Sequence, residues 1–248
     1  MRMFEELASR DTRMGLLSLR RRHEPVTGRD VFEVKLGDEY LMSSLFTVAE
    51  EELSRLGLAA CGTPGDLQVV VGGLGLGYTA LAALEDARVA RLTVIDALED
   101  VIAWHRDDLL PATVGLAADP RVELVHGDFF ALARDGGLGT GLDAVLVDID
   151  HSTRHHLDAS HADLYTPAGL ARLAGALRPG GVFALWSDDA PEEPFLADLR
   201  AVFDRVDAHV VAFPNPLTGG TSSNTVYVAV TTHVDAGAVA AAASAGGA

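Results

Sequence analysis

A glycine-rich segment, Gly72 to Gly77, follows an apolar run and precedes a stretch of helical period. Glycine at Gly73, Gly75 and Gly77 lets the backbone turn tightly, and the helix start that follows offers free N–H groups to a carboxylate or a phosphate. By itself the loop does not distinguish one ligand from another. From Gly75 through Gly77 to Ala80 it also fits the relaxed dinucleotide-binding pattern, so NAD remains an alternative.

Two acidic residues end the strand-like runs that follow this loop. Asp96 lies 19 residues after Gly77, where a carboxylate can accept hydrogen bonds from both hydroxyls of a ribose. Asp128 precedes Phe129 in the segment HGDFF, where a carboxylate could hold an adenine amino group and an aromatic ring could cover its face. With the glycine loop, these residues predict an adenosyl pocket. The alternative is that both acids are ordinary caps at strand ends.

A loop rich in acids and histidines, DIDHSTRHHLDASH over 148–161, follows the fourth apolar run. A transferase that works by in-line displacement needs proximity and orientation, and a base adds about 10²- to 10⁴-fold when the acceptor must lose a proton. We therefore expect Asp148 to frame the acceptor pocket and Asp150 and His151 to orient or deprotonate the acceptor. The other histidines of the loop are expected to be polar residues of a solvated lid: His155, His156 and His161.

Asp188 and Asp189 follow the fifth apolar run. Together with Asp148 or Asp150 they could supply oxygen ligands to Mg²⁺, as in metal-dependent O-methyltransferases. The alternative is an acidic start that suits the dipole of the helix after Pro191. We expect this second interpretation, and therefore no metal among the site residues.

These residues need a parallel sheet to bring them together. From Leu67 onward, apolar runs alternate with amphipathic stretches, the pattern of a parallel sheet with helices on both faces. The expected strands cover 67–71, 91–96, 121–127, 142–148 and 181–187, and the expected helices cover 78–87, 98–110, 129–134, 167–177 and 191–205. Two later strand-like runs, DAHVVAFPNP and SNTVYVAV, have no helix between them and must pair antiparallel. The sequence thus predicts an α/β fold with a class I methyltransferase-type, Rossmann-like sheet that ends in an antiparallel hairpin.

A small β-hairpin appendage is expected ahead of this sheet. The runs GLLSLRRRH and DVFEVKLGDEYLM alternate around the turn VTGRD, and an amphipathic helix follows near 45–58. We expect the appendage to cover 1–43, the α/β domain 44–234, and a disordered tail of Ala and Gly 235–248.

The composition excludes several classes of protein. The 248 residues include 36 Asp and Glu against 19 Lys and Arg, a formal net charge of −17. This charge argues against binding to nucleic acid or to an anionic membrane surface, and it is compatible with a cationic ligand. The single Cys61 cannot close an intrachain disulfide, and the charged opening segment lacks the apolar stretch of a secretory signal. We expect a cytoplasmic protein.

Four segments together carry a specific resemblance: VIDALEDVI, HGDFF, LDAVLVDID and LRPGGVFA, in this order. They resemble the spermidine synthase family over roughly Gly15 to Val230, and DEYLMSSLF and FPNPLTGG also have counterparts there. That family joins an N-terminal β-hairpin domain to a class I S-adenosylmethionine-type fold. The resemblance implies a cofactor role for the loop glycines, a ribose-binding role for Asp96 and an adenine-binding role for Asp128. It also implies a homodimer, because the family's hairpin domains often build dimers.

The chain departs from the family at the acceptor side. Aminopropyl-transferring members carry an Asp-x-x-Asp motif after the fourth strand, and here its first acid is Asp148 but its second position is His151. A Tyr-His-Glu-like stretch of polyamine-binding members matches Met42, Ser43 and Ser44. We therefore expect S-adenosylmethionine-dependent methyl transfer to a small, possibly cationic molecule. The alternatives are aminopropyl transfer from decarboxylated S-adenosylmethionine, and a non-catalytic protein that binds an adenosyl ligand.

Overall fold

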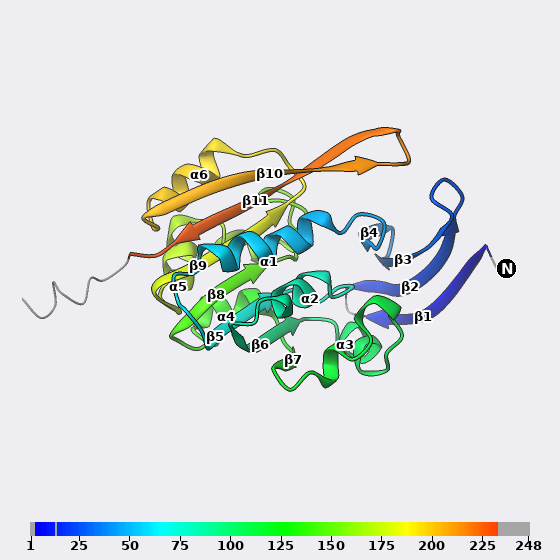
Figure 1. Cartoon of the computed structure of the whole chain (residues 1–248), viewed down its shortest axis with the longest axis horizontal. Coiled ribbons are helices and arrows are strands. Elements are labelled where there is room, and N and C mark those ends of the chain that lie inside the picture. Colours follow the sequence, from blue (N-terminus) through cyan, green and yellow to red (C-terminus); the bar gives the residue numbers. More distant parts are fainter. Residues whose placement is uncertain (1–2, 13, 233–248) are drawn as a thin grey trace, which may run out of the picture.

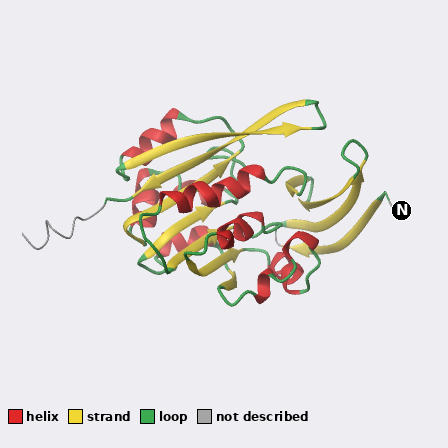
Figure 2. Cartoon of the chain, in the orientation of Figure 1, coloured by secondary structure: helices red, strands yellow, loops and turns green. Residues whose placement is uncertain are grey.

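The structure is a computed structural model that describes residues 3–12 and 14–232. Within these residues the chain forms two β-sheets, with helices packed on the larger one (Figure 1; Figure 2). The tail predicted over 235–248 lies outside the described residues. No helix of the described part is long and apolar enough to cross a bilayer.

The larger sheet has the predicted topology. Its seven strands are β5 (Leu67–Gly72), β6 (Val89–Asp96), β7 (Val122–His126), β8 (Leu142–Val147), β9 (Leu177–Ser187), β10 (Arg205–Asn215) and β11 (Gly220–Val230). Their order is β10-β11-β9-β8-β5-β6-β7. Strands β5 to β9 pair in parallel, whereas β11 runs antiparallel to both β9 and β10. The predicted parallel sheet with a terminal antiparallel hairpin is confirmed.

The order of the strands fixes where a ligand can bind. After β5 the chain moves to β6 and β7 on one side, and it then returns to β8 and β9 on the other side. A crevice opens beyond the carboxyl ends of the strands where the order reverses, here between β5 and its two neighbours. The glycine loop follows β5, Asp96 is the last residue of β6, and Asp148 follows β8.

Helices cover both faces of the sheet, as the alternating pattern predicts (Figure 1). One face packs on α1 (Val48–Ala60), α2 (Tyr78–Glu85) and α3 (Glu99–Arg106), and the other packs on α4 (Phe129–Asp135), α5 (Pro167–Ala174) and α6 (Glu193–Arg200). Successive strand residues point to opposite faces, so Val69 and Val71 join the first core while Val70 joins the second.

The N-terminal sheet has four antiparallel strands: β1 (Phe4–Thr12), β2 (Gly15–Glu24), β3 (Arg29–Leu36) and β4 (Glu39–Ser43). The predicted hairpin corresponds to β2 and β3. Strand β1 was not predicted, because its sequence FEELASRDT is largely charged and has no clear alternation of apolar side chains. The predicted domain boundary falls between β4 and α1, and it remains a prediction.

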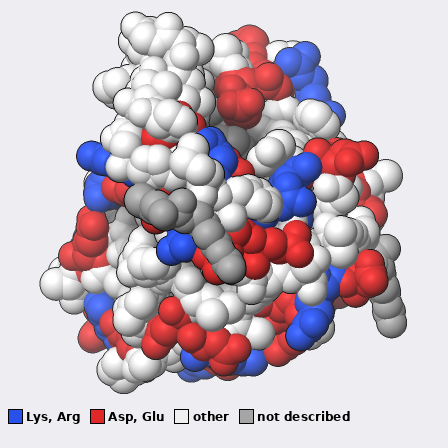
Figure 3. All heavy atoms as spheres, turned by 90° about the vertical axis from the view of Figure 1, so that its right-hand side faces the viewer, with Lys and Arg blue, Asp and Glu red and all other residues white. Residues whose placement is uncertain are grey.

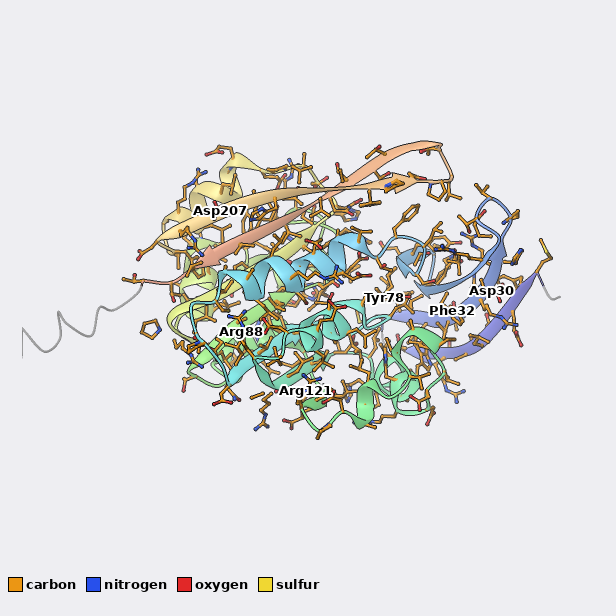
Figure 4. The ribbon with its side chains drawn as sticks, in the orientation of Figure 1. Asp30, Phe32, Tyr78, Arg88, Arg121 and Asp207 are labelled. Carbon is orange, nitrogen blue, oxygen red and sulfur yellow. The ribbon has the colours of Figure 1, made fainter. Side chains whose placement is uncertain are left out.

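Two labelled side chains in Figure 4 join parts of the fold. Tyr78, at the start of α2, forms a hydrogen bond with Ser44 directly after β4 and so links the N-terminal sheet to α2. Arg88 donates to the carbonyls of Leu58, Cys61 and Thr63 at the end of α1. These contacts tie the end of α1 and the segment after it to the residue before β6.

Several elements differ in length from the predicted ones. Strand β9 begins at Leu177, four residues before the predicted strand, and so includes the last residue of the predicted helix over 167–177. Helix α3 ends at Arg106, shortly before Asp108 takes a φ of 52°, a left-handed conformation that a helix cannot continue.

Candidate active site

A cavity lies at the carboxyl ends of β5, β6 and β8, at the predicted switch point. Residues from the N-terminal sheet, α1, the glycine loop and the 148–161 loop line it. The predicted site residues on its wall are Gly73, Gly75, Asp96, Asp128, Phe129, Asp148 and His151. Gly77 and Asp150 are absent from the described residues that form this wall.

The glycine loop is shaped by contacts within the protein. Gly73, Gly75 and Gly77 have φ values of 93°, 46° and 84°, which side chains other than glycine rarely adopt. A Cβ on Gly73 would collide with the carbonyl oxygen of Asp148, and one on Gly75 would collide with the sulfur of Met42. The sequence predicts that these glycines let a ligand approach the backbone closely. In the structure, other residues of the protein already lie so close to Gly73 and Gly75 that a side chain would not fit there.

A buried histidine holds this loop from the other side. The Nε2 of His105 lies 2.9 Å from the carbonyl oxygen of Gly75, and its Nδ1 lies 3.0 Å from the hydroxyl of Thr113. A Cβ on Gly77 would lie 2.8 Å from the His105 ring. Burial lowers the pKa of His105, so the neutral ring donates from Nε2 and accepts at Nδ1. Gly77 therefore starts α2 beside His105 and contributes no wall to the cavity.

The two predicted adenosyl-binding acids both line the cavity. One oxygen of Asp96 accepts the N–H of Leu74 at 2.9 Å, and the other accepts the N–H of Leu98 at 2.8 Å. Burial raises the pKa of Asp96. Asp128 caps α4 by accepting the N–H of Ala131 at 3.0 Å. One of its two oxygens therefore has the capping role that the alternative interpretation gives to this residue. These backbone contacts fix both carboxylates in place at the cavity wall.

Asp148 is the carboxylate that β8 delivers into the cavity. Its Oδ2 accepts the hydroxyl of Thr79, at the start of α2, at 2.6 Å. Burial raises its pKa to about 6. An acid held in this way at the sheet edge can contact a ligand bound against the glycine loop.

Asp150 occupies a different position. It is 2% exposed, and its carboxylate accepts the N–H of Leu157 at 2.7 Å, Nδ1–H of His161 at 2.8 Å and the hydroxyl of Tyr165 at 2.8 Å. All three donors belong to the loop and helix that follow. These hydrogen bonds make Asp150 the anchor of the loop that covers the cavity. Its carboxylate does not lie on the cavity wall, where the predicted role of proton acceptor would require it.

The histidines of the loop also separate into different environments. His151 lines the cavity, and its carbonyl accepts the N–H of Asp188 at 2.8 Å. His161 is 8% exposed, stacks on Phe130 with ring centroids 3.7 Å apart, and lines the cavity. The prediction that His161 is a solvated lid residue is wrong, since the residue is buried, its ring stacks on Phe130 and its Nδ1 contacts Asp150.

Sequence reasoning missed one acid in the cavity. Glu50 lies in the first turn of α1, is 9% exposed and lines the same cavity as Asp148. Its signal in the sequence is its spacing from Leu53 and Gly57, which places an acid on the apolar face of the helix. Trp186, near the end of β9, is also a residue of this wall.

The possible magnesium site is not assembled from the predicted acids. Asp188 accepts the side-chain amide of Asn224 at 2.6 Å, and Asp189 lies 3.8 Å from Arg154. In the part of the chain that the structure describes, no group of three or more His, Cys, Asp and Glu side chains is placed to hold a metal ion.

Charge on the outer surface does not form one basic face. On the side that carries the N-terminal sheet, acidic side chains spread over much of the surface and basic side chains are dispersed among them (Figure 3). Several of these charges are paired, as in the contact of Arg21 with Glu5 at 2.6 Å.

Two curated proteins resemble the chain over more than half of its length. Polyamine aminopropyltransferase 2 of Pseudomonas aeruginosa is 32% identical over 163 residues, which cover 62% of this chain and 44% of that protein. Polyamine aminopropyltransferase of Pyrobaculum islandicum is 29% identical over 146 residues, which cover 58% of this chain and 49% of that protein. The matches thus span about half the length of these relatives. No protein-family model matches the chain.

Solved structures resemble the chain over a longer range. A spermidine synthase from Thermotoga maritima, and a spermidine synthase in complex with the transition state analogue AdoDATO, each superpose with a TM-score of 0.67 and 18% identity. Both matches cover 91% of this chain and 72% of the other. A probable spermidine synthase from Corynebacterium glutamicum gives a TM-score of 0.59 and 17% identity over 91% of this chain and 78% of the other. At such identities the likeness establishes the fold.

The prediction of methyl transfer is wrong. It rested on the departures at His151 and at Met42, but the relatives found by sequence are named aminopropyltransferases and the structural neighbours are spermidine synthases. The departures at the acceptor side are therefore no support for methyl transfer. The chain is similar in sequence to polyamine aminopropyltransferases and has a spermidine synthase-like fold, as its motifs predict.

Proposed function

We propose that this chain transfers an aminopropyl group from decarboxylated S-adenosylmethionine to a small cationic amine. The observation that carries the proposal is one cavity whose wall holds both predicted adenosyl-binding residues and the acids Asp148 and Glu50. The names of the relatives support the same group transfer.

Each wall residue has a proposed role. Asp96 accepts the ribose hydroxyls, Asp128 and Phe129 hold the adenine, and Gly73 and Gly75 form the surface against which the nucleoside lies. Two backbone N–H groups already orient Asp96, which suits a fixed acceptor for a diol. Asp148 faces the acceptor, and His151 contacts it from the covering loop.

The electrostatics favour this donor and acceptor. A donor that carries a carboxylate would bring a further negative charge toward buried acids, and like charges in a poorly solvated site repel strongly. A decarboxylated donor avoids that repulsion. An ammonium acceptor instead offsets the charge of the acids.

Asp150 acts in this proposal as a positioning residue. It holds the loop through Leu157, His161 and Tyr165, and this loop carries His151 over the cavity. The predicted homodimer and cytoplasmic location remain predictions.

Product analysis tests the proposal. The chain is incubated with S-adenosylmethionine or its decarboxylated form and a panel of linear diamines, monoamines and phenols, and mass spectrometry identifies the group gained by the acceptor. We expect aminopropylated amine only with the decarboxylated donor. Tight binding of adenosyl thioethers without any product would favour the non-catalytic alternative. Binding of NAD with no heat from any adenosyl thioether would contradict the pocket assignment itself.

A further inference from the structure

Glu50 is a deeply buried acid whose position on α1 needs an explanation. It is 9% exposed, yet it lines the cavity between the first turn of α1 and the end of β8. The only hydrogen bond to its side chain in the described residues comes from its own backbone N–H. Burying a carboxyl group without a partner from elsewhere in the protein is costly, so this geometry points to a partner that enters with a ligand.

The groups around Glu50 add negative charge to the site. The pKa of its carboxyl group is raised by the negative charges of Asp148 at the end of β8, Glu51 on its own helix and Asp188 after β9. Tyr78 of α2 also packs nearby, and burial raises the pKa of its hydroxyl. No described Lys or Arg acts on Glu50 or Asp148. A cation delivered to this place would therefore meet uncompensated acids.

The titration of the two acids fits such a site. Burial, followed by the charge of Asp148, raises the pKa of Glu50 to about 8, whereas the pKa of Asp148 is raised to about 6. Near neutral pH the pair thus holds one proton and one negative charge. An ammonium group that binds between the two carboxyl groups replaces this proton, because it stabilises both carboxylates.

The rest of the wall suits an alkylammonium ion. Trp186 and His151 line the same cavity, as do the apolar side chains of Leu41 and Met42 from the N-terminal sheet. An aromatic indole attracts a cation at its face, and apolar side chains can pack against methylene groups. Ser43 and Ser44, at the place where polyamine-binding relatives carry other side chains, do not line the cavity in the described residues.

We propose that the carboxyl groups of Glu50 and Asp148 together bind the ammonium group of the acceptor amine, and that Glu50 takes up the proton that this group must lose. The inference rests on the proposed aminopropyl transfer. It assigns to α1 the acid that the sequence does not supply at position 151.

The step balances as follows. The bound ammonium gives one proton to the Glu50 carboxylate and becomes a neutral amine. The amine nitrogen then attacks the propyl carbon attached to sulfur, so that a C–N bond forms while the C–S bond breaks and its electron pair stays on sulfur. The new secondary ammonium keeps the two protons that remain on its nitrogen, and Glu50 later releases its proton to water. A base with a raised pKa is better suited to this transfer than an ordinary carboxylate.

Proton release on amine binding tests the site without turnover. Diaminobutane is titrated into the full chain at pH 7, with the thioether product bound, in buffers that differ in ionisation enthalpy. We expect the wild type to release about one proton per diamine, since the bound cation displaces the proton of Glu50. Glu50→Gln should release none and bind the diamine on the order of tenfold more weakly. Glu52→Gln, on the same helix with its side chain paired to Arg55 at 3.2 Å, is the control and should behave as the wild type.

Turnover with the decarboxylated donor separates failure of the site from failure of the proposed function. We expect Glu50→Gln to raise KM for the amine and to remove the rise of kcat/KM toward pH 8. If the wild type makes product and Glu50→Gln retains its proton release, KM and pH profile, the proposed site is wrong and the function stands. If no amine is aminopropylated but diamine binding still releases a Glu50-dependent proton, the ammonium site stands and the proposed function is wrong.

Discussion

Replacing Asp150 by alanine should destabilise the protein by several kcal/mol. The carboxylate accepts three hydrogen bonds, from Leu157, His161 and Tyr165, and it is 2% exposed. Each donor left without a partner in a buried place costs about 1–3 kcal/mol. Three such donors give roughly 3–9 kcal/mol, and the loss lies toward the lower end where the loop opens to water.

Asparagine at the same position gives the matched comparison. Its amide has nearly the shape of the carboxylate and keeps one oxygen as an acceptor, so the loss is the charge assistance of the contacts, about 1–2 kcal/mol. Urea unfolding of the wild type and both variants measures the two losses, and a single slope should describe all three curves.

Activity measurements on the same variants decide between anchoring and proton transfer. If Asp150 anchors the loop, Asp150→Asn should keep most of the activity. A proton acceptor would instead lose about 10²- to 10⁴-fold with little change in stability. That second outcome, or an alanine variant within about 1 kcal/mol of the wild type, would refute the anchoring argument.

Three further predictions concern residues of the cavity and its loop. In urea titrations, the free energy of unfolding should fall as pH rises from about 5 to 8, relative to that of Glu50→Gln. The reason is that Glu50 keeps its proton in the folded state, with a pKa of about 8, whereas the unfolded state loses it near 4.5. This difference in pKa corresponds to a change of at most roughly 4–5 kcal/mol in the free energy of unfolding. An equal pH dependence of the wild type and Glu50→Gln would contradict the prediction. Asp96→Asn should weaken binding of the adenosyl donor about tenfold in calorimetry while far-UV circular dichroism is unchanged. His105→Phe should cost about 1–2 kcal/mol in urea unfolding and weaken donor binding, because the Gly75 carbonyl loses its partner; unchanged affinity would show that the loop keeps its shape without it.

The elements of the sheet could be predicted because their signals are local. Runs such as Leu67–Gly72 are apolar on both sides, as a strand between two layers of helices must be. Strand β1 was missed for the opposite reason: it lies at the edge of a small sheet with none of its residues fully buried, and paired charges such as Arg21 and Glu5 stabilise it. A strand held by its neighbour leaves little periodic signal of its own.

The acids of the site show where sequence reasoning reaches its limit. Asp148 and Asp150 are two residues apart after the same strand, so the sequence places both near the cavity. Only the path of the loop separates them, because it turns Asp150 toward His161 and Tyr165. Glu50 is one of three consecutive glutamates, and the sequence alone could select it only by the helical spacing that puts it beside Leu53.

The contacts that hold the glycine loop from two sides have a consequence for how a donor is bound. Met42 presses on Gly75 from the small sheet, and His105 holds the carbonyl of Gly75 from α3. A nucleoside therefore meets a wall that already has its final shape, and little ordering entropy is lost when it docks. The glycine loop also couples the N-terminal sheet to the donor site, because any shift of that sheet moves Met42 against the loop on which the donor binds.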